Sequence, residues 1–214
     1  MSGVEEEGVV EGGAKVGADN AGRDDDRSRL RRRDRGMDEA WVRAFMTAAP
    51  FGYLATVGDD GQPYLNSNLF VYDEDRHCIY LHTHRTGRTR DNFDGAEKVA
   101  FSASGMGRLL PAPEALEFSV EYCGVNAFGT GRVVEDVEEA KAALQALLDK
   151  YAPHLRPGPD YRATTDEELA RTAVFRIDVE AWSGKQKEVE ADFPGAFALP
   201  DLPVPFPSRS VGSE

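Results

Sequence analysis

Strand-like segments follow one another along this chain with few helices between them. Apolar and β-branched residues bounded by glycine, proline or acidic turns predict strands at 52–58, 62–72, 77–83, 98–104, 118–135 and 174–182. A parallel doubly wound sheet would need a helix between successive strands, and this order does not provide them. Glycines at positions 124, 129 and 131 predict sharp bends in the longest segment. The sequence therefore predicts a mainly β fold, a mostly antiparallel β-barrel with peripheral helices.

Three helices are expected around this barrel. The first is predicted at 38–49, and the second at 137–152 with Asp136 as its N-cap. Thr165 and Glu168 form a capping-box pattern that opens a short third helix. The apolar face of the first helix is predicted to consist of Trp41, Ala44, Phe45 and Ala48.

Composition divides the chain into one domain and two tails. Residues 1–36 contain too few large apolar groups to offset the entropy of ordering them, so a disordered N-terminal tail is expected. Residues 37–192 form the predicted folded domain. Residues 193–214 are proline-rich and are expected to form an extended C-terminal tail.

The charge balance excludes some classes of partner. The chain carries 25 Lys and Arg against 38 Asp and Glu, a net charge of -13, which argues against binding to nucleic acid. No apolar run is long enough to cross a bilayer, and no signal-peptide core is seen at the N-terminus. The two cysteines, Cys78 and Cys123, lie in strand-like apolar surroundings and are predicted to be buried free thiols. A cytoplasmic protein is expected.

The segment 79–93, IYLHTHRTGRTRDNF, runs against this acidic background. A predicted strand ends in a turn that is dense in hydroxyls and cations, and a short helix is expected to follow. Guanidinium groups, hydroxyls and the free N–H groups of a glycine turn and a helix start are what a phosphate monoester needs. Arg88 is the strongest candidate, with Thr86 and Gly87 as partners. The alternative is a solvated basic face, in which Arg85 and Arg90 balance nearby carboxylates.

A metal site is the other chemistry that this region suggests. His82 and His84 are two residues apart on a strand, so both side chains can face one side, while His77 points away from Cys78. The spacing matches neither a zinc ribbon nor a helix-based zinc motif. No metal is therefore expected.

Four segments in order resemble one protein family. They read GYLATVGDDGQPYLNSNLFVY, IYLHTHRTGRTRDNF, FSVEYCGVNAFGTGRVVED and IDVEAWSGK, and they lie within residues 38–187. Together they resemble the FMN-binding split-barrel proteins, the pyridoxamine 5'-phosphate oxidase-like group, nearest its 5-nitroimidazole reductase-like branch. The resemblance implies a six-stranded antiparallel Greek-key split barrel. It also implies a homodimer with one FMN at each end of the interface.

The resemblance also implies which residues bind the cofactor. The family's phosphate-binding turn falls on Thr83, Thr86, Gly87 and Arg88. The segment that lines the flavin ring falls on Asn66, Ser67, Asn68 and Leu69. His82 stands where relatives of the nitroimidazole branch have a histidine near the ring, and Trp182 and Lys185 match the family's tryptophan and lysine ending.

Two departures from the family pattern bear on the substrate. Many relatives read Tyr-Arg-Ser-Val where this chain has Tyr122, Cys123, Gly124 and Val125, so a substrate contact from this strand is in doubt. The C-terminal arginine-rich segment of the pyridoxamine phosphate oxidases has no equivalent here, which argues against vitamin B6 synthesis.

The functional expectation is an FMN-dependent oxidoreductase that acts on a small-molecule electron acceptor, as a nitroreductase or related reductase does. The flavin would carry the chemistry, so no catalytic side chain is required, and His82 is the one candidate for proton transfer. One alternative is a flavin-binding sensor without turnover. The other is a split barrel that binds deazaflavin or haem in place of FMN.

Overall fold

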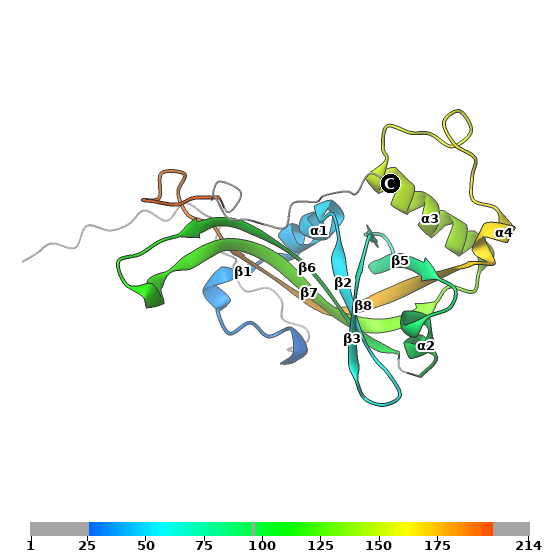
Figure 1. Ribbon diagram of the computed structural model, residues 1–214, viewed down its shortest axis with the longest axis horizontal. Helices are drawn as coiled ribbons and strands as arrows, with labels where there is room; N and C mark the ends of the chain where they lie inside the picture. The colour runs from blue at the N-terminus through cyan, green and yellow to red at the C-terminus, as the bar shows by residue number, and fades with distance from the viewer. Residues whose placement is uncertain (1–25, 96, 199–214) are drawn as a thin grey trace, which may run out of the picture.

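A computed structural model describes residues 26–95 and 97–198 (Figure 1). Within these residues, eight strands form one antiparallel sheet in the order β3-β2-β6-β7-β8-β5-β4, with β1 paired to β8. The strands are Gly36–Met37 (β1), Gly52–Val57 (β2), Pro63–Asn68 (β3), Val71–Asp73 (β4), Cys78–His84 (β5), Lys98–Leu110 (β6), Ser119–Val133 (β7) and Thr172–Lys187 (β8). The mainly β, antiparallel prediction is confirmed.

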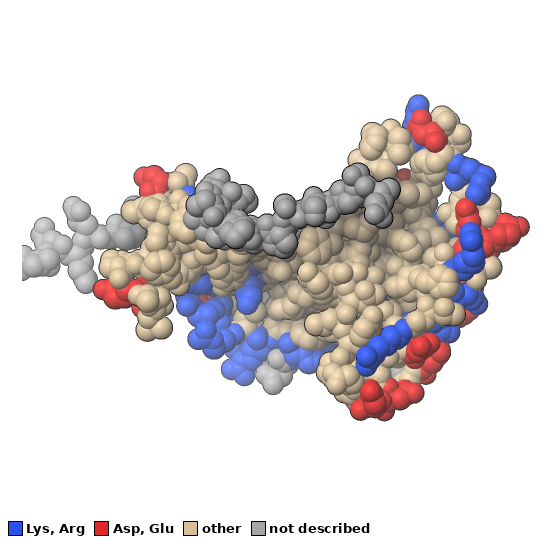
Figure 2. Space-filling model, in the orientation of Figure 1, with Lys and Arg blue, Asp and Glu red and all other residues tan. Residues whose placement is uncertain are grey.

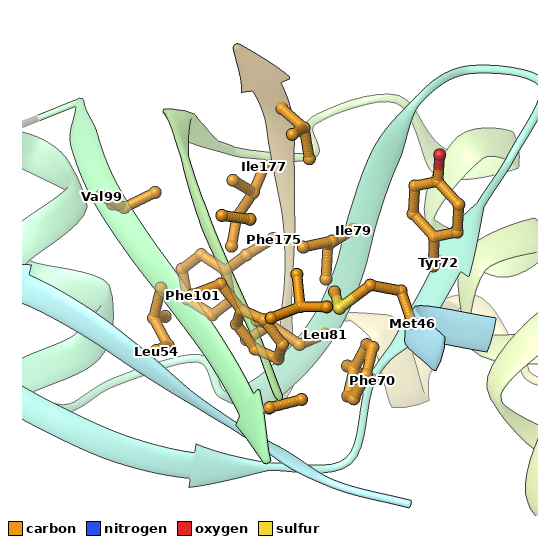
Figure 3. Packing of buried hydrophobic residues seen from close by; sticks show 14 of the residues in the cluster. Met46, Leu54, Phe70, Tyr72, Ile79, Leu81, Val99, Phe101, Phe175 and Ile177 are labelled. Carbon is orange, nitrogen blue, oxygen red and sulfur yellow. The ribbon is translucent and has the colours of Figure 1, made fainter. Parts of the chain in front are cut away.

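The sheet has two parts with different roles. At one end it curls around an apolar core in which Phe101, Phe175 and Leu54 are at most 1% exposed (Figure 3). At the other end, β6 and β7 continue past this core as a long hairpin, with β8 beside them (Figure 1). We call the first part the barrel and the second part the arm.

Four α-helices of the described residues lie around the sheet, and two of them, α3 and α4, begin at the predicted capping residues. Asp38 caps α1 (Glu39–Ala48), Asp136 caps α3 (Val137–Tyr151), and Thr165 opens α4 (Asp166–Leu169) through a capping box with Glu168. Helix α2 spans Arg88–Gly95. The predicted apolar face of α1 is wrong in part: Val42 and Met46 are buried, whereas Ala44 and Ala48 are exposed.

The strand count differs from the six of the expected barrel. The additional strands, β1 and β4, are only two and three residues long. Strand β4 arises because the predicted strand 62–72 is interrupted at Leu69 and Phe70. The Tyr151 hydroxyl fills the interruption: it accepts a hydrogen bond from the Phe70 N–H at 3.1 Å and lies 3.0 Å from the Phe70 carbonyl oxygen.

The expected N-terminal tail is in part a folded element. Residues 1–25 lie outside the described residues, but 26–36 contain two 3-10 turns and the start of β1. Gly36 pairs with Lys185 of β8, so backbone hydrogen bonds fix this segment although few of its side chains are apolar. Of the predicted C-terminal tail, residues 199–214 lie outside the description, and Phe197 pairs with Leu109.

Both cysteines are free thiols; Cys78 is buried and Cys123 is half-buried. No helix in the described ranges is long and apolar enough to span a bilayer.

Candidate functional site

Strand β5 leads into helix α2 through the turn 85–87, and this turn is fixed by its own side chains. Gly87 has a φ of 132°, in the region that favours glycine. The Thr86 N–H donates to His84 Nδ1 at 3.2 Å, and the Thr86 hydroxyl lies 3.0 Å from the same nitrogen. The Thr83 hydroxyl donates to the His84 carbonyl oxygen at 2.9 Å. The predicted phosphate donors Thr83 and Thr86 therefore already have partners within the chain.

Arg88 is the first residue of α2 and lies exposed at the surface. Its Cζ atom is 5.0 Å from the centroid of the Tyr64 ring, a cation–π contact. Among the described residues no carboxylate forms an ion pair with Arg88, whereas Arg90 is paired with Asp94 one turn along the helix. The first N–H groups of a helix have no intrahelical partners and carry partial positive charge. Arg88 and the start of α2 therefore form an anion-binding arrangement.

Buried polar contacts hold α2 against the β2–β3 hairpin. Asn66 Nδ2 of β3 donates to the Thr89 hydroxyl at 3.1 Å, and Asn92 Nδ2 donates to the Thr56 hydroxyl of β2 at 2.7 Å. Thr89 and Asn92 are each 5% exposed. These contacts bring the predicted ring-lining strand and the predicted phosphate turn together.

The other residues of the predicted ring-lining segment, Ser67, Asn68 and Leu69, lie on two opposite faces of the sheet. Asn68 is 9% exposed, and its amide nitrogen donates to the Asn66 carbonyl oxygen at 2.9 Å. Ser67 and Leu69 point the other way and are exposed, with Leu69 52% exposed. Of this segment, Asn66 provides the hydrogen bond to helix α2.

His82 lies beside the turn on an open surface. It is exposed and pairs across the ladder with Val174. A hollow of about 440 Å³ adjoins it, lined by His82, Thr83, His84, Glu168, Arg171 and Thr172. A second hollow of about 330 Å³ includes Thr86, Arg85 and Arg90 in its lining. Within the described ranges no group of three His, Cys, Asp or Glu side chains is placed to hold a metal ion.

Trp182 and Lys185 lie away from the turn in the same chain. Ala173 of β8 pairs with Thr83, and Trp182 is nine residues further along the strand, about 30 Å at a rise of about 3.3 Å per residue. Trp182 Nε1 donates to Glu39 Oε2 at 2.8 Å, which ties the indole to helix α1. Lys185 Nζ lies 5.5 Å from the centroid of the Tyr122 ring on the arm. Within one chain, these two residues do not complete the site at Arg88.

The structure adds site residues that the sequence reasoning missed. Tyr64 lies under Arg88, and Thr89 and Asn92 anchor α2. Alternation along β3 puts Tyr64 on the same face as Asn66, and helical spacing puts Thr89 beside Asn92. Both patterns are present in the sequence, but they indicate site residues only when α2 is known to pack on β3.

The fold places this protein in the class of split barrels, and solved structures share the fold. The flavocytochrome Anf3 from Azotobacter vinelandii is 21% identical, with a TM-score of 0.67 over 84% of this chain and 94% of that chain. The FAD and heme binding protein from Mycobacterium smegmatis is 22% identical, with a TM-score of 0.65 over 83% and 91%. A protein described provisionally as a 5-nitroimidazole antibiotic resistance protein, from Bacteroides thetaiotaomicron, is 19% identical, with a TM-score of 0.59 over 72% and 90%.

The family model for pyridoxamine 5'-phosphate oxidase matches residues 38–186. The chain therefore belongs to the pyridoxamine 5'-phosphate oxidase family, which confirms the resemblance seen in the sequence. No curated protein matches the chain.

Proposed function

We propose that this protein binds FMN at the Arg88 turn and acts as a flavin-dependent oxidoreductase on a small-molecule electron acceptor. The observation that carries the proposal is Arg88 itself. It is a cation without a carboxylate partner in the described chain, at the start of a helix, beside the left-handed Gly87 turn. In a chain with a net charge of -13, such a group is arranged to receive an anion from outside the chain.

The residues present fit a phosphate monoester. Arg88 would pair with its charge, and the free N–H groups at the start of α2 would donate to its oxygens. Asn66, held by Thr89, would present its remaining hydrogen-bonding groups beside this position. Thr86 would contribute only by exchanging its contact with His84. A bound flavin would supply the hydride or electron transfer, and the protein would supply orientation and charge.

A visible absorption spectrum tests which cofactor the protein binds. Two similar structures are a flavocytochrome and a FAD and heme binding protein, which supports a redox cofactor but does not select FMN. We expect freshly purified protein to be yellow, to fluoresce green, and to bind one FMN per chain in a calorimeter. A Soret band would instead indicate haem, and colourless protein that refuses FMN would contradict the proposal.

A flavin binder without turnover is the second candidate. It is favoured by Cys123 and Gly124, which stand where the resemblance implies an arginine and a serine for substrate contact. The two functions separate when NADPH or dithionite is the reductant and a nitroaromatic compound is the acceptor. Steady turnover supports the oxidoreductase, and reduction of the flavin without turnover supports the binder.

We further propose that the protein is a homodimer that buries the outer face of the β2–β3 hairpin. Leu65 is 66% exposed, Leu69 52% and Tyr53 43%, and Leu65 pairs directly with Ala55. Such a face is unfavourable in water. Light scattering tests the proposal: Leu65→Asp is expected to give monomers, and Leu116→Asp, at a residue 91% exposed on the arm, is expected to leave the dimer intact. A monomeric wild-type protein would contradict it.

A further inference from the structure

The arm carries a cluster of cations that the proposed flavin site does not explain. Arg35 Nη1 donates to the Tyr122 hydroxyl at 3.1 Å, and Arg35 Cζ lies 5.8 Å from the centroid of the Tyr122 ring. Lys185 Nζ lies 5.5 Å from the same centroid. Lys187 pairs with Tyr122 across the ladder, and its Nζ donates to the Ser119 hydroxyl. We call these five residues the arm cation site, and Figure 2 shows Lys and Arg side chains gathered beneath the arm.

Two distant parts of the chain build this site. Gly36 of β1 pairs with Lys185 of β8, and this pairing places Arg35 beside the arm. Lys185 and Lys187 are two residues apart on one strand, so they share a face with Tyr122. Without the N-terminal segment the guanidinium group would be missing from the cluster.

The nearby carboxylates Asp34, Glu121 and Glu188 each have another hydrogen-bond partner. Asp34 accepts hydrogen bonds from Arg32 at 2.9 and 2.6 Å and forms a longer ion pair with Arg35 at 3.9 Å. Glu121 is held by Arg108 at 2.7 Å. In the described part of the chain, no ion pair neutralises Lys185 or Lys187. The arm cation site is therefore locally positive, although Asp and Glu outnumber Lys and Arg by 38 to 25 in the whole chain.

The crowding of like charges has a consequence for Lys187. Its pKa is lowered, first by burial and then by the positive charge of Arg35. Charges held this close repel one another, and an anion between them would turn that repulsion into attraction.

We propose that the arm cation site binds a small oxyanion of the phosphate class, either inorganic phosphate or the phosphate group of a small ester. The site offers a guanidinium group, two ammonium groups and two hydroxyls, all of which donate hydrogen bonds. Three positive charges suit a doubly charged anion better than a singly charged one. Within one chain the arm cation site is separate from the proposed flavin site, because Lys185 lies twelve residues, about 40 Å, along β8 from the residue paired with Thr83.

The test is a calorimetric titration of the full chain, loaded with FMN and then freed of excess FMN, in a phosphate-free buffer of low ionic strength. Inorganic phosphate and glycerol 3-phosphate are the two probes, and tighter binding of the ester identifies an ester as the better ligand. We expect saturable binding of one anion per chain. Lys187→Ala and Arg35→Ala are each expected to weaken it about tenfold or more, and Tyr122→Phe about threefold. Arg76→Ala, which removes an exposed arginine paired with Asp73, is the matched control and is expected to leave it unchanged.

Absence of a binding heat with both probes would overturn the proposal, as would an equal loss in Arg76→Ala. Ser119→Ala keeps every charge and provides a second variant if Lys187→Ala fails to fold. The same titration on Arg88→Ala separates this site from the flavin site. Anion binding that survives in that variant supports the arm cation site even if FMN is never bound, and binding lost there would assign the phosphate to the Arg88 turn.

Discussion

The barrel and the arm both hold cations in an acidic chain, but in different settings. At the barrel, one guanidinium group, that of Arg88, lies over an aromatic ring at a helix start. On the arm, Arg35 and Lys185 lie over the Tyr122 ring, and Lys187 pairs with Tyr122 across the ladder. The first setting suits a single phosphate group approached from the helix end. The second suits an anion enclosed by side chains alone.

Each region also contains a paired cation beside its unpaired ones. Arg90 is bound to Asp94 on α2, and Arg108 on the arm binds Glu121 and three carbonyl oxygens of residues 189–191. Arg108 holds the backbone of residues 189–191 in place, whereas Arg88 and Lys185 are exposed and form no ion pair among the described residues. The presence or absence of an ion pair therefore distinguishes cations that support the fold from candidate ligand-binding cations.

The largest expected effect is on the free energy of unfolding, and it compares a residue of the barrel core with one at the tip of the arm. Phe101 is 1% exposed and packs edge-on to Phe70, with ring centroids 4.8 Å apart. Phe101→Ala is expected to lower the free energy of unfolding by about 3–5 kcal/mol, because it leaves a cavity. Leu116→Ala, at a residue 91% exposed, is expected to change it by less than about 0.5 kcal/mol. Urea denaturation measures both, and similar losses would show that the arm is as tightly packed as the barrel.

The next effect tests whether the barrel alone binds the flavin. Arg88→Ala is expected to weaken FMN binding by about 1.5–3 kcal/mol, the usual contribution of a hydrogen bond to a charged group. Arg76→Ala serves as the control, since that arginine is paired with Asp73 away from the turn. Calorimetry or quenching of flavin fluorescence gives the affinities. An unchanged affinity in Arg88→Ala would remove this residue from the site.

A smaller effect concerns the support beneath Arg88. Thr89→Val keeps the shape of the side chain but removes the acceptor for Asn66 Nδ2. We expect a loss of about 1 kcal/mol of stability, because the half-buried Asn66 amide loses its partner, together with weaker FMN binding. Denaturation and FMN titration of the same variant measure the two quantities. Lost stability with full FMN affinity would show that Asn66 does not position the site.

The last prediction concerns acid and the arm. Hydrogen bonds from Arg108, Val189 N–H and Arg108 N–H lower the pKa of Glu121 to about 2 from an ordinary 4.5. A carboxyl whose folded pKa is depressed stabilises the fold fully above its unfolded pKa, and this contribution is lost as pH falls towards the folded pKa. Wild-type stability is therefore expected to fall more steeply between pH 4.5 and 2 than that of Glu121→Gln. Parallel acid-unfolding curves would contradict this assignment.

Local sequence predicted the parts of the fold that depend on near neighbours. Asp136 and the Thr165–Glu168 pair mark helix starts because a cap needs only the next three residues. The turn after β5 was predicted for the same reason, since Gly87 and the residues around it are adjacent in the chain. The interruption at Phe70 was missed because the hydroxyl that fills it belongs to Tyr151, 81 residues away.

By itself, the sequence determined the antiparallel β class, the helix caps, the family and the position of the Arg88 turn. Tertiary structure alone decided that Asn66 meets Thr89, that Trp182 and Lys185 lie far from the turn in the same chain, and that Arg35 reaches Tyr122. The physical reason is range: caps and turns are fixed by residues a few positions apart, whereas these contacts depend on strand pairings between distant segments. Register between strands that are distant in the sequence depends on which faces the assembled sheet buries, so no local pattern fixes it.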